Sequence, residues 1–183
     1  MQFVWEIFCE ELYRANREHN LKILNFILMS NHFHMIAYTP EANISDCMQQ
    51  LMFRTSRRLT TSGNRINQTY AGRYFKCILQ SQQFLMNAYK YSYRNPVAAG
   101  ICKNVEDYEF STIQFLLSSQ TSAFPIIKDE IFSSDPPGII KWLNMAPDPE
   151  KLEGVRYGLK RQYFTSKRNI HNKKLLISEF DTI

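Results

Sequence analysis

The sequence predicts an α+β domain in which a small antiparallel sheet carries helices on one face. Amphipathic helical segments alternate with short β-rich runs, two of these runs follow one another directly, and no internal repeat interrupts the order. At 183 residues the chain can bury one good core, because a domain of this size buries roughly 70% of its unfolded surface. Hydrophobic residues make up 44% and charged residues 21%, which is typical of a globular protein.

The elements of the first half follow from local patterns. Residues 1–19 are expected to form a helix, with Val4, Phe8 and Leu12 on one face. Residues 21–30 and 31–39 are β-rich and apolar, so they should form a hairpin or closely joined strands. Asn43 can cap a second helix. The buried stripe of that helix is expected to consist of Ile44, Met48, Leu51, Met52 and Leu59.

The second half reads as a loop over residues 60–69, a strand over 73–79 and a helix over 84–95. From about residue 117 the sequence becomes a polar linker, and Asp135-Pro136-Pro137-Gly138 is a strong helix and strand breaker. We therefore expect one domain over residues 1–116, followed by a linker and a helical, basic extension over residues 117–183.

Composition excludes several classes of protein. There is no signal peptide and no apolar run long enough to span a bilayer, so we expect a cytoplasmic protein without a membrane partner. The four cysteines are too widely spread for a Cys-x-x-Cys site and are interpreted as reduced thiols. The net charge of +5 is modest, so the position of the basic residues matters more than their number.

The first candidate functional residues are two histidines in Met29-Ser30-Asn31-His32-Phe33-His34-Met35-Ile36. Alternate side chains of a strand point to the same face, so His32 and His34 should lie side by side, about 7 Å apart at the backbone, with Phe33 turned the other way. Two imidazoles in this arrangement can share one cation. A His-x-His pair on a strand is also often purely structural.

About sixty residues later, the expected helix over 84–95 supplies two further groups. Tyr91 and Asn95 are four residues apart and share a helix face, so a phenol nucleophile and a carboxamide oxygen ligand can point the same way. Tyr89 and Tyr93 lie roughly 200° around the helix axis from Tyr91, and we interpret them as packing residues.

These residues resemble the single-tyrosine HUH endonucleases and transposases, and within them the REP-associated tyrosine transposases. The strand motif of this family, Pro-Asn-His-hydrophobic-His, appears as Ser30-Asn31-His32-Phe33-His34, and its helix motif as Tyr91-Ser92-Tyr93-Arg94-Asn95-Pro96-Val97. Two further family motifs match Gly72-Arg73-Tyr74-Phe75-Lys76 and Asp107-Tyr108-Glu109-Phe110-Ser111-Thr112. The four motifs occur in the family's order and cover about residues 20–112.

The resemblance implies a ferredoxin-like sheet, the HUH endonuclease fold, in a bacterial, nucleoid-associated enzyme. Such an enzyme cleaves and rejoins single-stranded DNA beside hairpins through a 5′-phosphotyrosine intermediate. His32, His34 and Asn95 would bind Mg²⁺ or Mn²⁺, and Tyr91 would attack the DNA. The family has a central strand before the first helix, whereas this sequence begins almost at the helix. Three explanations are open: the strand lies upstream, another segment or a partner chain replaces it, or the sheet is incomplete. Whether the protein forms a homodimer is a separate open question.

Basic residues in and near the motif-bearing domain are candidates for contacts to the DNA backbone. They are Arg54, Arg57, Arg58, Arg65, Arg73 and Lys76. Residues 156–174 contain seven basic and no acidic residues, which suits either a phosphate-binding segment or a solvated tail. The alternative function is a catalytically inactive protein that binds nucleic-acid hairpins. A hydrolase using water would need carboxylates near the histidines, and residues 21–40 contain none.

Overall fold

The computed structural model describes residues 1–63, 70, 74–117, 122–128, 134–168, 171, 175–178 and 181–183. Contacts within the chain define two compact units. Unit 1 consists of Met1–Tyr74 and Glu109–Pro136, and unit 2 of Phe75–Tyr108 and Pro137–Ile183. Each unit thus combines two separate stretches of the chain. The domain boundary expected between residues 116 and 117 stays a prediction.

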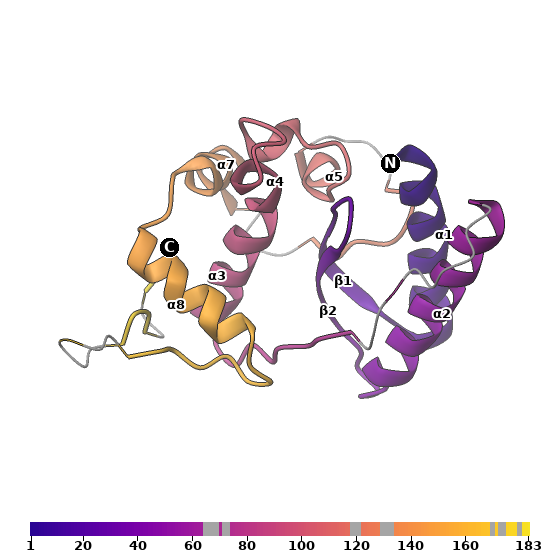
Figure 1. Cartoon of the computed structure of the whole chain (residues 1–183), viewed down its shortest axis with the longest axis horizontal. Coiled ribbons are helices and arrows are strands. Elements are labelled where there is room, and N and C mark those ends of the chain that lie inside the picture. Colours follow the sequence, from indigo (N-terminus) through magenta and orange to yellow (C-terminus); the bar gives the residue numbers. More distant parts are fainter. Residues whose placement is uncertain are drawn as a thin grey trace. The chain divides into compact units, whose positions relative to one another are not determined.

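Unit 1 contains two long helices beside a β-hairpin (Figure 1). Helix α1 spans Gln2–His19 and helix α2 spans Ile44–Ser62. Strands β1 (Lys22–Leu28) and β2 (Phe33–Tyr38) pair antiparallel. A short helix, α5, covers Ile113–Leu117. The predicted helices and hairpin are confirmed, and the mixed α+β class is consistent with a HUH-like fold.

Two details of α2 differ from the expectation. Asn43 occupies the N-cap position, but its side chain makes no capping hydrogen bond. Residues 60–62, expected to be loop, belong to the helix, because no Pro or Gly precedes Gly63 and the Gly63 amide continues the helical pattern by donating to Leu59 O at 3.0 Å. Residues 64–69 of the expected loop lie outside the described residues.

The core of unit 1 is aromatic and centres on Phe26 of β1. Its ring lies 5.8 Å from Trp5 and 5.5 Å from Phe8 of α1, and 5.7 Å from Phe33 of β2. The Phe124 ring meets it edge-on at 6.1 Å, a favourable arrangement for aromatic pairs. This cluster holds the hairpin against α1 and therefore fixes the strand that carries His34.

A later segment covers the second edge of β1. The Leu28 amide donates to Phe110 O and the Thr112 amide donates to Phe26 O, both at 2.9 Å. Further along, the Ile127 amide donates to Ile23 O at 2.8 Å. Ser111 forms an antiparallel bridge to Ile27 and Ile126 a parallel bridge to Ile23, so two short pieces of opposite direction satisfy backbone groups along this edge.

The helices of unit 2 are α3 (Gln82–Tyr93), α4 (Asn95–Ala98), α7 (Pro136–Asn144) and α8 (Pro149–Leu159), with a 3₁₀ turn at Val105–Asp107. The expected breaker at 135–138 instead starts α7, because proline in the first turn removes no intrahelical hydrogen bond. The expected basic extension is helical over α8, and residues 160–168 are not. No helix in the described part of the chain is long and apolar enough to cross a membrane.

The strand expected over residues 73–79 is not formed. Arg73 lies outside the described residues, and residues 74–79 are irregular apart from one bridge at Ile78. The Ile78 amide donates to Gln162 O at 2.8 Å, and the Phe164 amide donates to Ile78 O at 3.0 Å. The backbone of this segment thus pairs with a partner more than eighty residues away, which its local pattern does not reveal.

The core of unit 2 is a cluster of Val155, Phe164, Ile177 and Ile183. The Phe84 ring of α3 stacks on Phe164 at 4.3 Å. Gly158 of α8 allows this packing, because a Cβ added there would lie 2.8 Å from the Phe164 ring. The four cysteines of the chain are free thiols, as the sequence indicates.

Candidate active site

The connection between β1 and β2 places the two histidines. Leu28 pairs with Phe33, and the Met29 amide donates to His32 O at 2.8 Å, which closes a tight turn. His32 is therefore the last turn residue and not part of the strand, whereas His34 lies in β2. The Phe33 ring packs on the opposite face, 5.4 Å from Phe8, as the alternation of strand side chains predicts.

The geometry of the histidine pair suits a shared cation. The two Nε2 atoms lie 3.2 Å apart, and the imidazole rings are nearly perpendicular with centroids 4.9 Å apart. Two imidazole nitrogens bound at about 2.1 Å and at right angles to one metal would lie about 3.0 Å apart. The residues therefore fit a divalent ion. Among the described residues there is no group of three or more His, Cys, Asp or Glu side chains that could complete such a site.

Asn31 orients the first imidazole. Its Oδ1 lies 2.6 Å from His32 Nδ1, so Nδ1–H donates to the carboxamide and Nε2 keeps its lone pair. Hydrogen bonds of this kind commonly fix the tautomer and ring direction of a metal-binding histidine. In the sequence, Asn31 is part of the family motif, but the pattern alone assigns it no role.

Tyr91 and Asn95 lie at the end of α3 and the start of α4. The expected helix over 84–95 ends at Tyr93, and Pro96 follows Asn95 as the second residue of α4. Asn95 Nδ2 donates to Tyr91 O at 2.8 Å. This bond keeps the carboxamide beside Tyr91 despite the break, and it leaves Oδ1 as the oxygen that could bind a cation.

The three tyrosines of α3 differ in their surroundings. Tyr89 and Tyr93 are fully buried, and their rings are parallel within 5° at a centroid distance of 6.2 Å. Tyr91 is only half-buried and packs against the core cluster of unit 2. These surroundings agree with the interpretation of Tyr89 and Tyr93 as packing residues. His32 and His34 belong to unit 1 and Tyr91 and Asn95 to unit 2, so their assembly into one site stays a prediction.

Two cations beside Tyr91, the buried Lys90 and the half-buried Arg94, have no role assigned by the sequence motifs. Lys90 is almost fully buried, with Nζ 4.9 Å from the centre of the Trp142 ring, and burial together with Arg94 lowers its pKa to about 8. Arg94 donates to Leu143 O at 2.9 Å and to Asn144 O at 2.7 Å, which are carbonyls at the end of α7. In the sequence, only the four-residue spacing of Lys90 and Arg94 indicates that these two side chains share a helix face.

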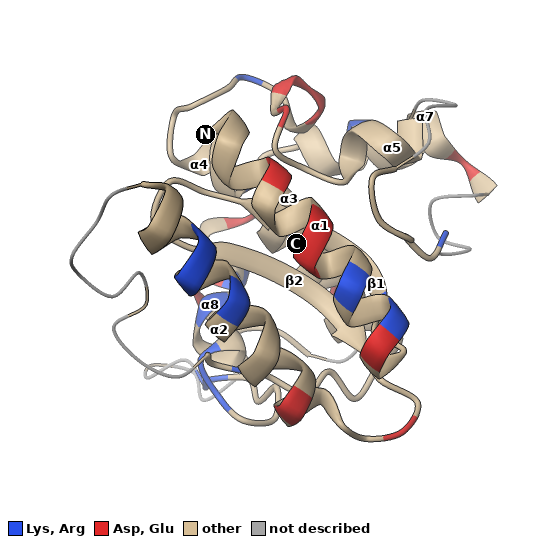
Figure 2. Cartoon of the chain, turned by 90° about the vertical axis from the view of Figure 1, so that its right-hand side faces the viewer, with Lys and Arg blue, Asp and Glu red and all other residues tan. Residues whose placement is uncertain are grey.

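The arginines expected to contact DNA are not equivalent. Arg54 pairs with Glu18 at 2.7 Å, and Arg58 pairs with Glu10 at 2.7 Å and Glu11 at 3.0 Å. These pairs join α1 and α2, which both carry acidic and basic residues (Figure 2). Arg57 is exposed and, within the described residues, makes no ion pair. Lys76 is also exposed, and Arg65 and Arg73 lie outside the described residues.

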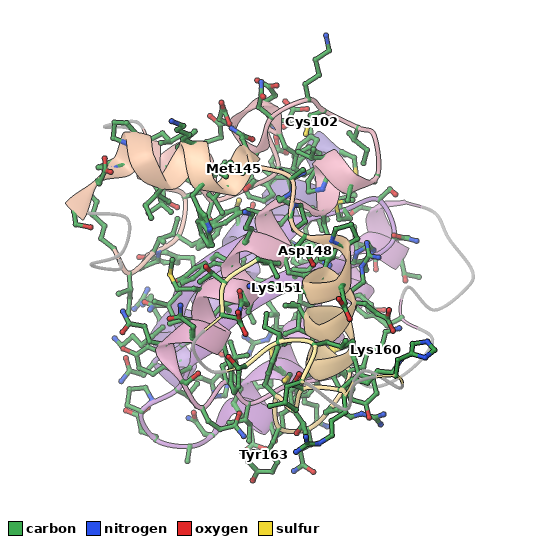
Figure 3. The ribbon with its side chains drawn as sticks, turned by 90° about the vertical axis from the view of Figure 1, so that its left-hand side faces the viewer. Cys102, Met145, Asp148, Lys151, Lys160 and Tyr163 are labelled. Carbon is green, nitrogen blue, oxygen red and sulfur yellow. The ribbon has the colours of Figure 1, made fainter. Side chains whose placement is uncertain are left out.

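The basic segment after Arg156 is partly built into unit 2. Lys167 pairs with Glu153 at 2.8 Å, and the Arg161 guanidinium lies 4.4 Å from the centre of the Tyr157 ring. Figure 3 shows Lys160 at the end of α8 and Tyr163 in the chain beyond it. Residues 160–168 are thus anchored by contacts within the unit, and they do not form a freely solvated tail.

His32 and His34 on the hairpin, and Tyr91 and Asn95 at the end of α3 and the start of α4, are the residues that carry the resemblance to the HUH transposases. In agreement, residues 4–91 match the model of the family described as "Transposase IS200 like". No curated protein and no solved structure matches the chain. Over these residues the chain is similar to IS200-like transposases, and the expected resemblance to the single-tyrosine transposase superfamily is confirmed. This family supports a role as a transposase or DNA endonuclease that binds DNA.

Proposed function

We propose that the protein cleaves and rejoins single-stranded DNA beside hairpins, with Tyr91 as nucleophile and His32, His34 and Asn95 as ligands of Mg²⁺ or Mn²⁺. The observation that supports this most directly is the 3.2 Å separation of the two Nε2 atoms on a hairpin whose other face is anchored in an aromatic core. Assignment to the REP-associated subgroup, recognition of hairpins and a homodimer belong to the same proposal.

The chemistry requires help for a weak nucleophile and a poor leaving group. The Tyr91 phenol oxygen attacks the phosphorus, the bond from phosphorus to the 3′ oxygen breaks, and a 5′-phosphotyrosine and a 3′-hydroxyl result. The phenol proton must pass to a base as the new bond forms, while the departing 3′ oxygen gains a proton. A bound divalent ion would polarise the phosphate and stabilise the developing negative charge. The same steps in reverse join the DNA to another strand without ATP.

Within the chain, each residue has a separate task in this scheme. Asn31 accepts from His32 Nδ1 and so leaves Nε2 to bind the ion, and the packing of Phe33 keeps His34 on the opposite face of the strand. The hydrogen bond from Asn95 to Tyr91 O holds the carboxamide oxygen beside the nucleophile. The tyrosine ring itself is supported by the apolar cluster of unit 2.

A labelled single-stranded hairpin substrate, mixed with the protein and Mn²⁺ and run on a denaturing gel, tests the proposal. Wild type should give a covalent adduct, and Tyr91→Phe should give none, because the change removes one oxygen and keeps the packed ring. Tyr89→Phe and Tyr93→Phe are matched controls that should still form adduct, with folding checked by circular dichroism.

An adduct that persists in Tyr91→Phe would contradict the assignment of the nucleophile. If no variant and no wild-type sample forms adduct, although hairpin DNA binds, the inactive binding protein is the better description.

A further inference from the structure

Asn87 lies on α3 four residues before Tyr91, on the same helix face. Its side chain is 0% exposed, and a buried carboxamide must find partners for both its donor and its acceptor. Nδ2 donates to Asp181 O at 2.8 Å, and Oδ1 accepts from the Ile183 amide at 2.9 Å. One side chain therefore holds two backbone groups of a distant segment, which we call the strap and define as residues 175–178 and 181–183.

The strap is also fastened from α8. Lys151, on the first turn of α8 (Figure 3), donates from Nζ to Asp181 Oδ1 at 2.7 Å. Asp181 Oδ2 accepts from the Ser178 amide at 3.0 Å and from Ser178 Oγ at 2.7 Å. The bond from Lys151 and those from Ser178 lower the pKa of Asp181 to about 2, so the carboxylate is charged at neutral pH.

The apolar side of the strap supports the tyrosine ring. Ile177 and Ile183 are buried strap residues that form the core cluster of unit 2 together with Val155 and Phe164. Tyr91 packs against this cluster. Asn87 bonds directly to Ile183, whereas the Ile177 amide donates to Ser166 Oγ at 3.0 Å. Asn87 therefore ties one member of the cluster that supports Tyr91 to the helix that carries this tyrosine.

We propose that Asn87 is a positioning residue for strand cleavage: it holds the strap on α3 and so fixes the direction of the Tyr91 phenol. This inference rests on the proposed role of Tyr91 as nucleophile. A nucleophile must be aligned with the phosphorus and its leaving group, and a misplacement of about 1 Å can lower a rate about 100-fold. Asn87 acts through the strap and touches neither DNA nor metal.

Asn144 offers a matched control in the same unit. Its Oδ1 accepts from the Val105 amide at 2.9 Å, and its Nδ2 donates to Glu106 Oε2 at 2.7 Å. Asn87→Ala and Asn144→Ala thus remove the same type of side chain with the same number of hydrogen bonds, but only the first releases the strap. Asp181→Asn is a milder variant that keeps the backbone carbonyl bound by Asn87 and weakens the ion pair to Lys151.

The experiment uses the full chain and two readouts. The first is the single-turnover rate of adduct formation at saturating hairpin DNA with Mn²⁺, measured beside the DNA affinity. Asn87→Ala should lower the rate by about tenfold to 100-fold with unchanged affinity, and Asn144→Ala should change neither. Asp181→Asn should fall in between, and it serves as the test if Asn87→Ala does not fold. The second readout is the NMR signal of the ¹³C-labelled Tyr91 ring without DNA, which Asn87→Ala and Asp181→Asn should shift and Asn144→Ala should not.

Equal adduct rates and equal Tyr91 signals in folded Asn87→Ala and Asn144→Ala would overturn the proposal and leave Asn87 with an ordinary structural role. If wild type forms no adduct, the proposed function fails. The Tyr91 signal then decides separately whether Asn87 sets the position of the ring.

Discussion

The histidine pair and the tyrosine are held in place by different kinds of contact. His32 is oriented by Asn31, its neighbour in sequence, and its partner His34 is two residues further on. The Tyr91 ring instead packs against a cluster whose members lie between residues 155 and 183, and Asn87 of the same helix bonds to the backbone of Asp181 and Ile183, 94 and 96 positions further along the chain. One half of the proposed chemistry is local in the sequence, and the other depends on long-range contacts.

This difference has a consequence for how mutations act. A hairpin with its own turn and core contacts can keep its two imidazoles together when distant residues change. The position of Tyr91 depends on contacts between α3 and the strap, and forming them closes a loop of about ninety residues between the two segments. Changes far from the motifs should therefore disturb the nucleophile more easily than the histidine pair.

The largest effect is expected for His32→Ala. Removing one imidazole should lower the affinity for Mn²⁺ by more than about 100-fold, since even loss of a residue that only orients a ligand costs about 10 to 100-fold. His32 is exposed, so the folding stability should change little. Titration calorimetry measures the affinity, with the exposed His171→Ala as the matched control. The same Mn²⁺ affinity in His32→Ala and wild type would show that the pair is structural.

A smaller effect, confined to unit 2, is expected for Gly158→Ala. The new Cβ would lie 2.8 to 2.9 Å from three atoms of the Phe164 ring, which is closer than real contacts allow. Overpacking of this kind costs about 1–3 kcal/mol. Urea unfolding measures the loss, and the Tyr91 ring signal should shift because Phe164 belongs to the cluster that supports it.

Gly100→Ala is the control for that change. Gly100 has φ 70° and a Cβ there would meet nothing within 4 Å, so only backbone strain of about 1–2 kcal/mol is expected. The Tyr91 signal should stay in place. If Gly100→Ala shifts this signal as much as Gly158→Ala does, the signal reports general destabilisation and not the strap.

The predictions from sequence succeeded where the signal was local. The helix over 1–19 and the hairpin follow from apolar periodicity, and the burial of Tyr89 and Tyr93 follows from their angle to Tyr91. The α+β class is confirmed for the same reason. The geometry of the His32 and His34 side chains also agrees with the two-residue alternation of an extended chain, although His32 itself lies in the turn.

The failures occurred where the partner of a segment is remote. Residues 74–79 have a strand-like pattern, but the backbone of Ile78 bonds to Gln162 and Phe164 outside any sheet. Pro136 and Pro137 start a helix because the residues after them pack within unit 2, which a breaker pattern cannot show. Asn87 belongs to no motif, and its importance appears only when the strap is seen to reach it.

The smallest effect concerns charges on α2, where Arg58 is paired with distant carboxylates and its neighbour Arg57 makes no ion pair within the described residues. Arg58 pairs across to Glu10 and to Glu11, which is 2% exposed, so Arg58→Ala should mainly lower the stability of unit 1. Arg57→Ala should leave stability unchanged. If Arg57 contacts a phosphate, its loss should reduce the slope of log affinity for hairpin DNA against log salt concentration by about 0.7 to 0.9.

Affinity measured between low and physiological salt, for wild type and both variants, separates these roles. A slope that is unchanged in Arg57→Ala would remove this residue from the DNA surface. A slope reduced by the same amount in Arg58→Ala, without any loss of stability, would show that Arg58 exchanges its carboxylate partners for phosphate. Helix α2 would then contact DNA in spite of its ion pairs with α1, and the distinction between the ion-paired Arg58 and the exposed Arg57 would fail for this helix.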